Sequence, residues 1–153
     1  CVHTTRQLHF CFARGAGTHL RGFMRGYARE TAFCKIYSYL LSGNVEEGFE
    51  QFDQSKLTDE DKAFADDLVR GTIANKTALD AVVSEYSRAF KLSRIYRIDL
   101  AALELALYEM QFTQTPHPVV INEAVSIVKK YSTEKSTQFV NGILAAYERG
   151  QNK

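Results

Sequence analysis

Residues 118–125 read Pro-Val-Val-Ile-Asn-Glu-Ala-Val and residues 138–144 read Gln-Phe-Val-Asn-Gly-Ile-Leu, and these two stretches decide the fold. Their apolar residues recur three and four positions apart, which is the spacing of one face of an α-helix. Pro118 suits the first helical position because a missing N–H costs nothing there. Asn122, Glu123 and Asn141 interrupt the apolar faces, which is costly unless they make specific contacts. The two stretches therefore predict packed helices joined by a short polar break.

Helical spacing also dominates the chain upstream of these stretches. It predicts helices over residues 25–42 and 98–112, with a short helix from Val45 to Phe52. A longer helix, of about 30 residues, is expected after Thr58, a good N-cap followed by three acidic residues. Gly71 should weaken this helix without ending it. Because no strand-like alternation appears, the sequence predicts an all-α fold, a compact bundle of six or seven helices.

Composition places the chain among single-domain globular proteins. Its 153 residues are enough for one core, and 45% are hydrophobic and 24% charged. No apolar run approaches the roughly 20 residues that span a bilayer, so we expect no membrane association. The cysteines Cys1, Cys11 and Cys34 are odd in number and form no Cys-x-x-Cys pair, so we expect neither a disulfide framework nor a metal site. This cysteine usage predicts a cytoplasmic location.

The first 23 residues differ from the rest of the chain. They hold three arginines and no acid, which leaves 16 of the 19 basic residues and all 18 acidic residues to the remainder. They show no helical or strand period, whereas Met24 opens a clean helical pattern. We therefore read residues 1–23 as a non-native or disordered N-terminal extension and residues 24–153 as the helical domain. The alternative is a genuine basic arm that grips nucleic acid.

Catalytic motifs are missing from the sequence. No glycine-rich run follows a strand, and His117 is the only histidine after residue 23, so neither a nucleotide loop nor a Ser-His-Asp set can be argued. The acidic runs 59–61 and 66–67 are read as solvated helix faces or as partners of a helix N-terminal dipole. We therefore expect a binding protein without a cofactor rather than an enzyme.

Several short motifs, in order and properly spaced, resemble the NusB family of transcription antitermination factors. They lie between Tyr27 and Tyr147, and the most specific are residues 121–124 and 139–144. The others are Ala28-Arg29-Glu30, Ile36-Tyr37-Ser38 and residues 102–109.

This resemblance implies a NusB-like helical factor that binds the boxA element of nascent, single-stranded RNA. The family acts with NusE, a ribosomal protein, in the RNA polymerase antitermination complex, notably on ribosomal RNA operons. A homodimer is also possible, since some relatives form dimers that hide the RNA surface. Two alternatives stay open: a stand-alone domain related to the RNA-binding domain of ribosomal RNA cytosine methyltransferases, and a helical scaffold that binds only protein.

The resemblance assigns RNA contacts to the start of the first helix. Arg25 and Arg29 lie where the family carries an arginine-rich motif, and the planar arginine fork suits phosphate. Gly26 and Tyr27 depart from a pattern that is often basic, although Tyr27 could stack on a base. Weaker electrostatic affinity should make RNA binding more dependent on NusE. The alternative for Arg25 is a solvated helix terminus.

A second set of RNA contacts is expected at the start of the last helix, where Lys135, Ser136, Gln138 and Phe139 stand. Free N–H groups there suit a phosphate, and Phe139 is either a stacking ring or a core residue. Lys135 replaces a frequent acid of the family, which should favour RNA. Asn122 and Glu123 are read as a buried polar bracket between helices, and Asn141 as a structural hydrogen-bonding residue.

Tyr37 and Asp99 fall where the family meets NusE. Asp99 would also stabilise the start of its own helix. Lys91 stands where an acid is expected, which puts part of the NusE contact in doubt.

Overall fold

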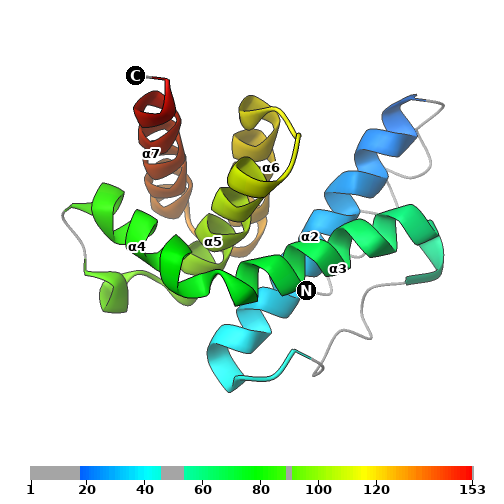
Figure 1. The fold of residues 1–153 in the computed structure, drawn as a ribbon, viewed down its shortest axis with the longest axis horizontal. Helices are drawn as coiled ribbons and strands as arrows, with labels where there is room; N and C mark the ends of the chain where they lie inside the picture. Colours follow the sequence, from blue (N-terminus) through cyan, green and yellow to red (C-terminus); the bar gives the residue numbers. More distant parts are fainter. Residues whose placement is uncertain (1–17, 46–53, 89–90, 153) are drawn as a thin grey trace.

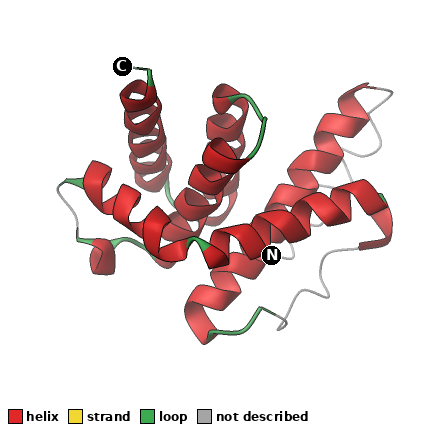
Figure 2. Cartoon of the chain, viewed as in Figure 1, coloured by secondary structure: helices red, strands yellow, loops and turns green. Residues whose placement is uncertain are grey.

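The chain folds into a bundle of α-helices in this computed structural model, which describes residues 18–45, 54–88 and 91–152. Figure 2 shows helices and connecting loops, and no strand occurs among the described residues, which confirms the predicted all-α class. The α-helices are α2 (Thr18–Ser42), α3 (Asp59–Ala74), α4 (Lys76–Ser87), α5 (Arg97–Phe112), α6 (His117–Tyr131) and α7 (Glu134–Gln151), and the 3-10 turns are η1 (Gln54–Lys56) and η2 (Leu92–Arg94). None of the described helices has the length and apolar character needed to cross a bilayer.

Helix α5 is the centre of the bundle and packs against α2, α3, α4, α6 and α7 (Figure 1). Every residue from 99 to 110 is buried, including Leu103 and Leu107 at 0% exposure. Its sequence is apolar almost all round, which is typical of a helix that is covered on every side. The helix predicted over residues 98–112 is thereby confirmed, and the remaining helices are arranged around it.

The first helix begins earlier than the sequence suggested. It starts at Thr18 rather than near Arg25, because nothing between these residues breaks a helix once it has formed; Gly22 only weakens it. The predicted stop is confirmed, since Gly43 has a φ of 76° and its N–H donates to the Tyr39 carbonyl at 2.8 Å. Residues 1–17 and most of the short helix predicted from Val45 to Phe52 lie outside the described residues.

The single long helix predicted after Thr58 is wrong, because the chain breaks at Asn75 into α3 and α4. The Asn75 N–H and its side-chain Nδ2 both donate to the Gly71 carbonyl, at 3.0 and 2.8 Å. An asparagine side chain that competes for backbone partners in this way ends a helix that apolar spacing alone would continue. The predicted start is confirmed: Thr58 accepts a hydrogen bond from the Asp61 N–H at 3.1 Å.

Gly71 has a second role, since it lets α3 approach α5 closely. A Cβ atom at this position would overlap the ring of Tyr108. That ring has little room to move, because it stacks on Phe112 with centroids 5.0 Å apart and donates from its hydroxyl to Asp67 at 3.3 Å. Glycine is therefore required here despite its cost to the helix.

We predict that Gly71→Ala destabilises the protein by about 1–3 kcal/mol, because overpacking outweighs the better helix propensity of alanine. Urea unfolding followed by circular dichroism measures the change. Gly142→Ala is the matched control, since nothing lies within 4 Å of a Cβ there, and it should be neutral or stabilising. Equal stability of the two variants would contradict the prediction.

A polar cluster around the buried Glu104 joins α4 to α5. Lys76 Nζ lies 2.6 Å from Asp80 and 3.5 Å from Glu104, whose side chain is 1% exposed. Burial, and next the neighbouring Asp80 carboxylate, raise the pKa of Glu104 from 4.5 to about 9. Glu104 therefore stays protonated at neutral pH in the folded protein, whereas it ionises in the unfolded chain.

The difference in the pKa of Glu104 between the folded and unfolded chain determines how the free energy of unfolding changes with pH. From pH 4.5 to about 9 the unfolded chain loses a proton that folded Glu104 keeps, so the free energy of unfolding falls as pH rises, by at most about 1.4 kcal/mol per pH unit. We predict that Glu104→Gln flattens this fall, because glutamine does not titrate. Thermal melts across the same pH window measure it, with the exposed Glu85→Gln on α4 as the control. Parallel curves for wild type and Glu104→Gln would rule out the assignment.

Candidate nucleic-acid interface

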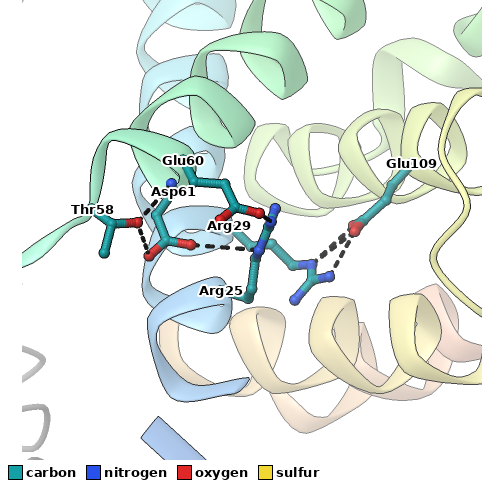
Figure 3. A network of polar contacts seen from close by, with 6 residues as sticks. All are labelled: Arg25, Arg29, Thr58, Glu60, Asp61 and Glu109. Carbon is teal, nitrogen blue, oxygen red and sulfur yellow. Dashed lines mark hydrogen bonds and ion pairs between the residues drawn. The ribbon is translucent and has the colours of Figure 1, made fainter. Parts of the chain in front are cut away.

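The side chain of Arg25, on α2, reaches the start of α3 rather than open solvent (Figure 3). Its Nη2 donates to Glu60 Oε1 at 3.1 Å, and its Nε lies 3.5 Å from Asp61 Oδ1. The guanidinium carbon stands 4.2 Å from the centre of the Phe64 ring, within cation–π range. Arg25 is therefore a partly exposed cation, 29% accessible, that two carboxylates and one ring hold in place.

The start of α3 is fixed by its own cap. Thr58 Oγ1 accepts from the Asp61 N–H and donates to Asp61 Oδ2 at 2.9 Å (Figure 3). Asp61 is buried at 7% exposure, whereas the Glu60 side chain is 65% exposed. The helix dipole stabilises both charges at this end. The two acids that contact Arg25 therefore differ: Asp61 is held by hydrogen bonds to Thr58, whereas Glu60 is exposed to solvent.

Arg29 is buried at 6% exposure, which corrects the expectation that it contacts RNA. Its Nε lies 3.0 Å from both Glu109 oxygens, and its Nη2 donates to Oε1 at 2.7 Å. These hydrogen bonds join α2 to α5. Figure 3 shows the Arg29 side chain pointing toward Glu109 and away from Glu60 and Asp61. A guanidinium committed to a buried carboxylate cannot reach a phosphate, because breaking the pair would leave Glu109 buried and unpaired.

Tyr27 is also buried, at 6% exposure, so its ring offers no face to a base and the predicted stacking role is wrong. The period of the first helix explains this, because Tyr27 falls on the apolar side together with Ala28 and Thr31, both buried. Of the residues predicted to bind RNA on α2, only Arg25 remains accessible.

The other side of α2 is tied to α6 by Glu30. Its carboxylate accepts from the Tyr131 hydroxyl at 2.6 Å and from Lys130 at 3.2 Å. Cys34 lies beside this contact, its Sγ 3.8 Å from the Tyr131 hydroxyl, and burial raises the pKa of its thiol to about 12. The thiol is therefore an inert packing group.

The polar bracket expected from residues 122 and 123 is only half right. Glu123 is partly buried, burial raises its pKa, and its Oε2 would lie 3.2 Å from a Cβ at Gly26. Asn122 and Asn141 are exposed instead, so neither is buried between helices.

A pocket of about 340 Å³ opens where α7 starts. Residues of η2, α5, α7 and the connection between η2 and α5 surround it: Arg94, Ile95, Tyr96, Asp99, Lys135, Ser136 and Phe139. It brings together three residues predicted to contact RNA and Asp99, which was predicted to contact a protein partner. Gln138 is exposed on α7 outside the lining, and Tyr37 lies on α2, half-buried, with its ring 6.3 Å from Phe33.

The rim of the pocket combines cations with aromatic rings. Arg94 and Lys135 are exposed, Tyr96 is 68% exposed, and Phe139 is partly buried. Arg94 and Tyr96 were not among the predicted RNA contacts, although Lys91, Arg94 and Arg97 stand close together in the sequence. Cations of this kind can contact phosphate and rings of this kind can stack on an unstacked base, so the pocket has the chemistry of a single-stranded nucleic-acid site.

The floor of the pocket is polar and buried. Ser136 donates its N–H to Thr133 Oγ1 at 3.1 Å, and its hydroxyl accepts from Ser132 at 2.9 Å. Because Ser136 is 3% exposed and engaged in this cap, it does not offer the phosphate the free N–H that we expected. Its role is to shape the start of α7.

Asp99 lies in the first turn of α5 at 3% exposure, which fits its predicted effect on its own helix. Burial raises the pKa of Asp99, while hydrogen bonds from Ser136 and Ser132 lower it. Its Oδ1 has no hydrogen-bond partner within the described part of the chain. The pocket thus contains a buried acceptor as well as cations and rings.

Comparison with known proteins identifies the family. The NusB family pattern matches residues 27–149. The antitermination protein NusB of Thermoanaerobacter sp. (strain X514) is 38% identical over 83% of this chain and 91% of its own length. T. maritima NusB has a TM-score of 0.73 at 31% identity, over 80% of this chain and 88% of its own.

A solved complex of the antitermination factors NusB and NusE with double-stranded RNA contains a chain with the same fold. It aligns at a TM-score of 0.72 and 29% identity, over 83% of this chain and 97% of that one. The family pattern, the sequence relatives and the solved structures agree with the resemblance of the short motifs. The chain belongs to the NusB family.

Proposed function

We propose that the protein is a transcription antitermination factor that binds boxA-type single-stranded RNA together with NusE and supports ribosomal RNA transcription. The observation that carries this proposal is the pocket at the start of α7, where Lys135, Phe139 and Asp99 lie around one cavity. Family membership supplies the context, since the relatives are antitermination proteins. The protein acts by binding, in the RNA polymerase antitermination complex of the cytoplasm.

The chemistry of each side chain in the pocket determines which part of the RNA it contacts. Lys135 and Arg94 contact phosphates at the rim, and Phe139 with Tyr96 stacks on an extruded base. Gln138 is close enough along α7 to extend this contact. Because the chain carries a net charge of only +1, its electrostatic attraction to RNA is modest, and a partner is needed to hold the RNA.

We assign the NusE contact to the side of the pocket that bears Asp99 and to Tyr37 on α2. A cationic group of the partner that reached Asp99 would satisfy its unpartnered oxygen. RNA and partner would then share one pocket, which makes their binding mutually supportive. A homodimer would be compatible with this function only in a state that leaves the pocket open.

Titration of labelled boxA RNA tests the proposal, with a scrambled strand and a boxA duplex as comparisons, at one stated salt concentration with and without NusE. With NusE, the single strand should bind at least about tenfold tighter than the scrambled strand. Equal binding of all RNAs would overturn the specific-RNA function. Binding of NusE with no effect of RNA would favour a protein-only scaffold.

We predict that Phe139→Leu weakens boxA binding about tenfold, because leucine keeps the apolar bulk but loses the stacking face. The matched control is Phe112→Leu, a phenylalanine 55% exposed at the opposite end of α5, which should bind RNA like wild type. Thermal melts check that both variants fold. A melting temperature lowered in Phe139→Leu with unchanged RNA affinity would assign Phe139 to the core instead.

Arg29 acts on this function only through the fold. We predict that Arg29→Met destabilises the protein by about 3–5 kcal/mol, because Glu109 is left buried without its partner, and that Arg29→Met with Glu109→Leu recovers most of the loss. Urea unfolding measures both variants. A direct RNA role would instead leave stability unchanged and lower the RNA affinity of the folded fraction.

A further inference from the structure

The two carboxylates beside Arg25 present anionic oxygens to its guanidinium, as the phosphates of an RNA backbone would. Its Nη2 donates to Glu60 at 3.1 Å, and its Nε faces Asp61 at 3.5 Å. A phosphate also presents anionic oxygens to the guanidinium fork. The cation predicted to bind RNA is thus already paired with carboxylates of the same chain.

The two carboxylates cannot exchange equally well. Asp61 is buried at 7% exposure, and hydrogen bonds to Thr58 at 2.9 and 3.1 Å hold it at the helix start. Glu60 is 65% exposed on a longer, more flexible side chain. Loss of Asp61 would unpair a buried group, whereas the Glu60 carboxylate is exposed to water, where an ion pair contributes little. Glu60 is therefore the ligand that an incoming anion would displace.

The rest of the contact would keep Arg25 in place during such an exchange. The Phe64 ring lies 4.2 Å beneath its guanidinium, and Asp61 remains beside Nε. An arginine held this way loses less conformational entropy when it meets a phosphate than a mobile one does. Asp61 and Phe64 therefore position the fork, and Glu60 competes for it.

We propose that Glu60 sets the RNA affinity of this protein by competing with a backbone phosphate for the guanidinium of Arg25. The inference rests on the proposed function, because it takes RNA as the ligand. When RNA binds, the Nη2 hydrogen bond passes from Glu60 Oε1 to a phosphate oxygen, and the released carboxylate is solvated. No covalent bond changes.

The test compares Glu60→Gln with Asp59→Asn in RNA titrations at one low salt concentration. Both variants remove one negative charge from the first turn of α3, but no ion pair links Asp59 to Arg25 among the described residues. Glu60→Gln should tighten RNA binding about threefold, the effect expected of an exposed ion pair, and Asp59→Asn should change it clearly less. Equal effects would mean that general electrostatics, rather than competition, explains the gain.

A double-variant comparison makes the test specific to Arg25. Arg25→Ala should weaken RNA binding, and in the Arg25→Ala background Glu60→Gln should give no more gain than Asp59→Asn. A gain from Glu60→Gln that still exceeds that of Asp59→Asn without Arg25 would overturn the proposal. Binding of NusE alone should be the same for wild type and Glu60→Gln; a change there would point to a protein contact instead.

The scrambled RNA separates this inference from the proposed function. A phosphate contact carries no sequence information, so the gain from Glu60→Gln should appear with boxA and scrambled RNA alike. An absent gain with intact boxA preference refutes the competition and leaves the proposed function standing. A present gain without boxA preference supports the competition and refutes specific recognition.

Discussion

The buried ion pair between Arg29 and Glu109 is the constraint on which the rest of the structure depends. It joins α2 to the central helix α5 through hydrogen bonds of 2.7 to 3.0 Å, with side-chain exposures of 7% and 2%. Taking both charges out of water is costly, so such a pair persists only with this geometry. Hydrogen bonds are directional, whereas apolar packing is not. This pair therefore fixes the rotation of α2 about its own axis.

That rotation decides what the other side chains of α2 can do. Once Arg29 faces α5, Arg25 meets α3 at Glu60 and Asp61, and Glu30 meets α6 at Lys130 and Tyr131. Charged groups on α2 thus tie together the helices around it. The basic character that the sequence displays at this helix is largely used within the fold, and accessible cations are found instead beside the start of α7.

The sequence predicted those parts of the fold that depend on local physics. The buried helix α5 follows from its composition, and the start of α3 from a cap whose partners lie three residues apart. The errors have a different origin. Glu109 lies 80 positions from Arg29, so no local pattern could show that this arginine is buried, and the break at Asn75 depends on one side chain choosing a backbone carbonyl. Long-range pairing, rather than periodicity, separates a binding arginine from a structural one.

The ion pairs of Arg25 and the pocket at the start of α7 also bear on how the protein would discriminate between RNA sequences. In the proposed competition, the acids that hold Arg25 lower its attraction to every RNA by the same factor, because a phosphate is identical in all sequences. Stacking in the pocket of Phe139 and Tyr96 is available only to a base that has left its own stack. A weaker phosphate contact at Arg25, with base stacking in the pocket unchanged, reduces binding to the many competing RNAs in a cell. Under the proposed function, a near-neutral member of the NusB family gains selectivity by binding RNA weakly alone and relying on a second protein for strength.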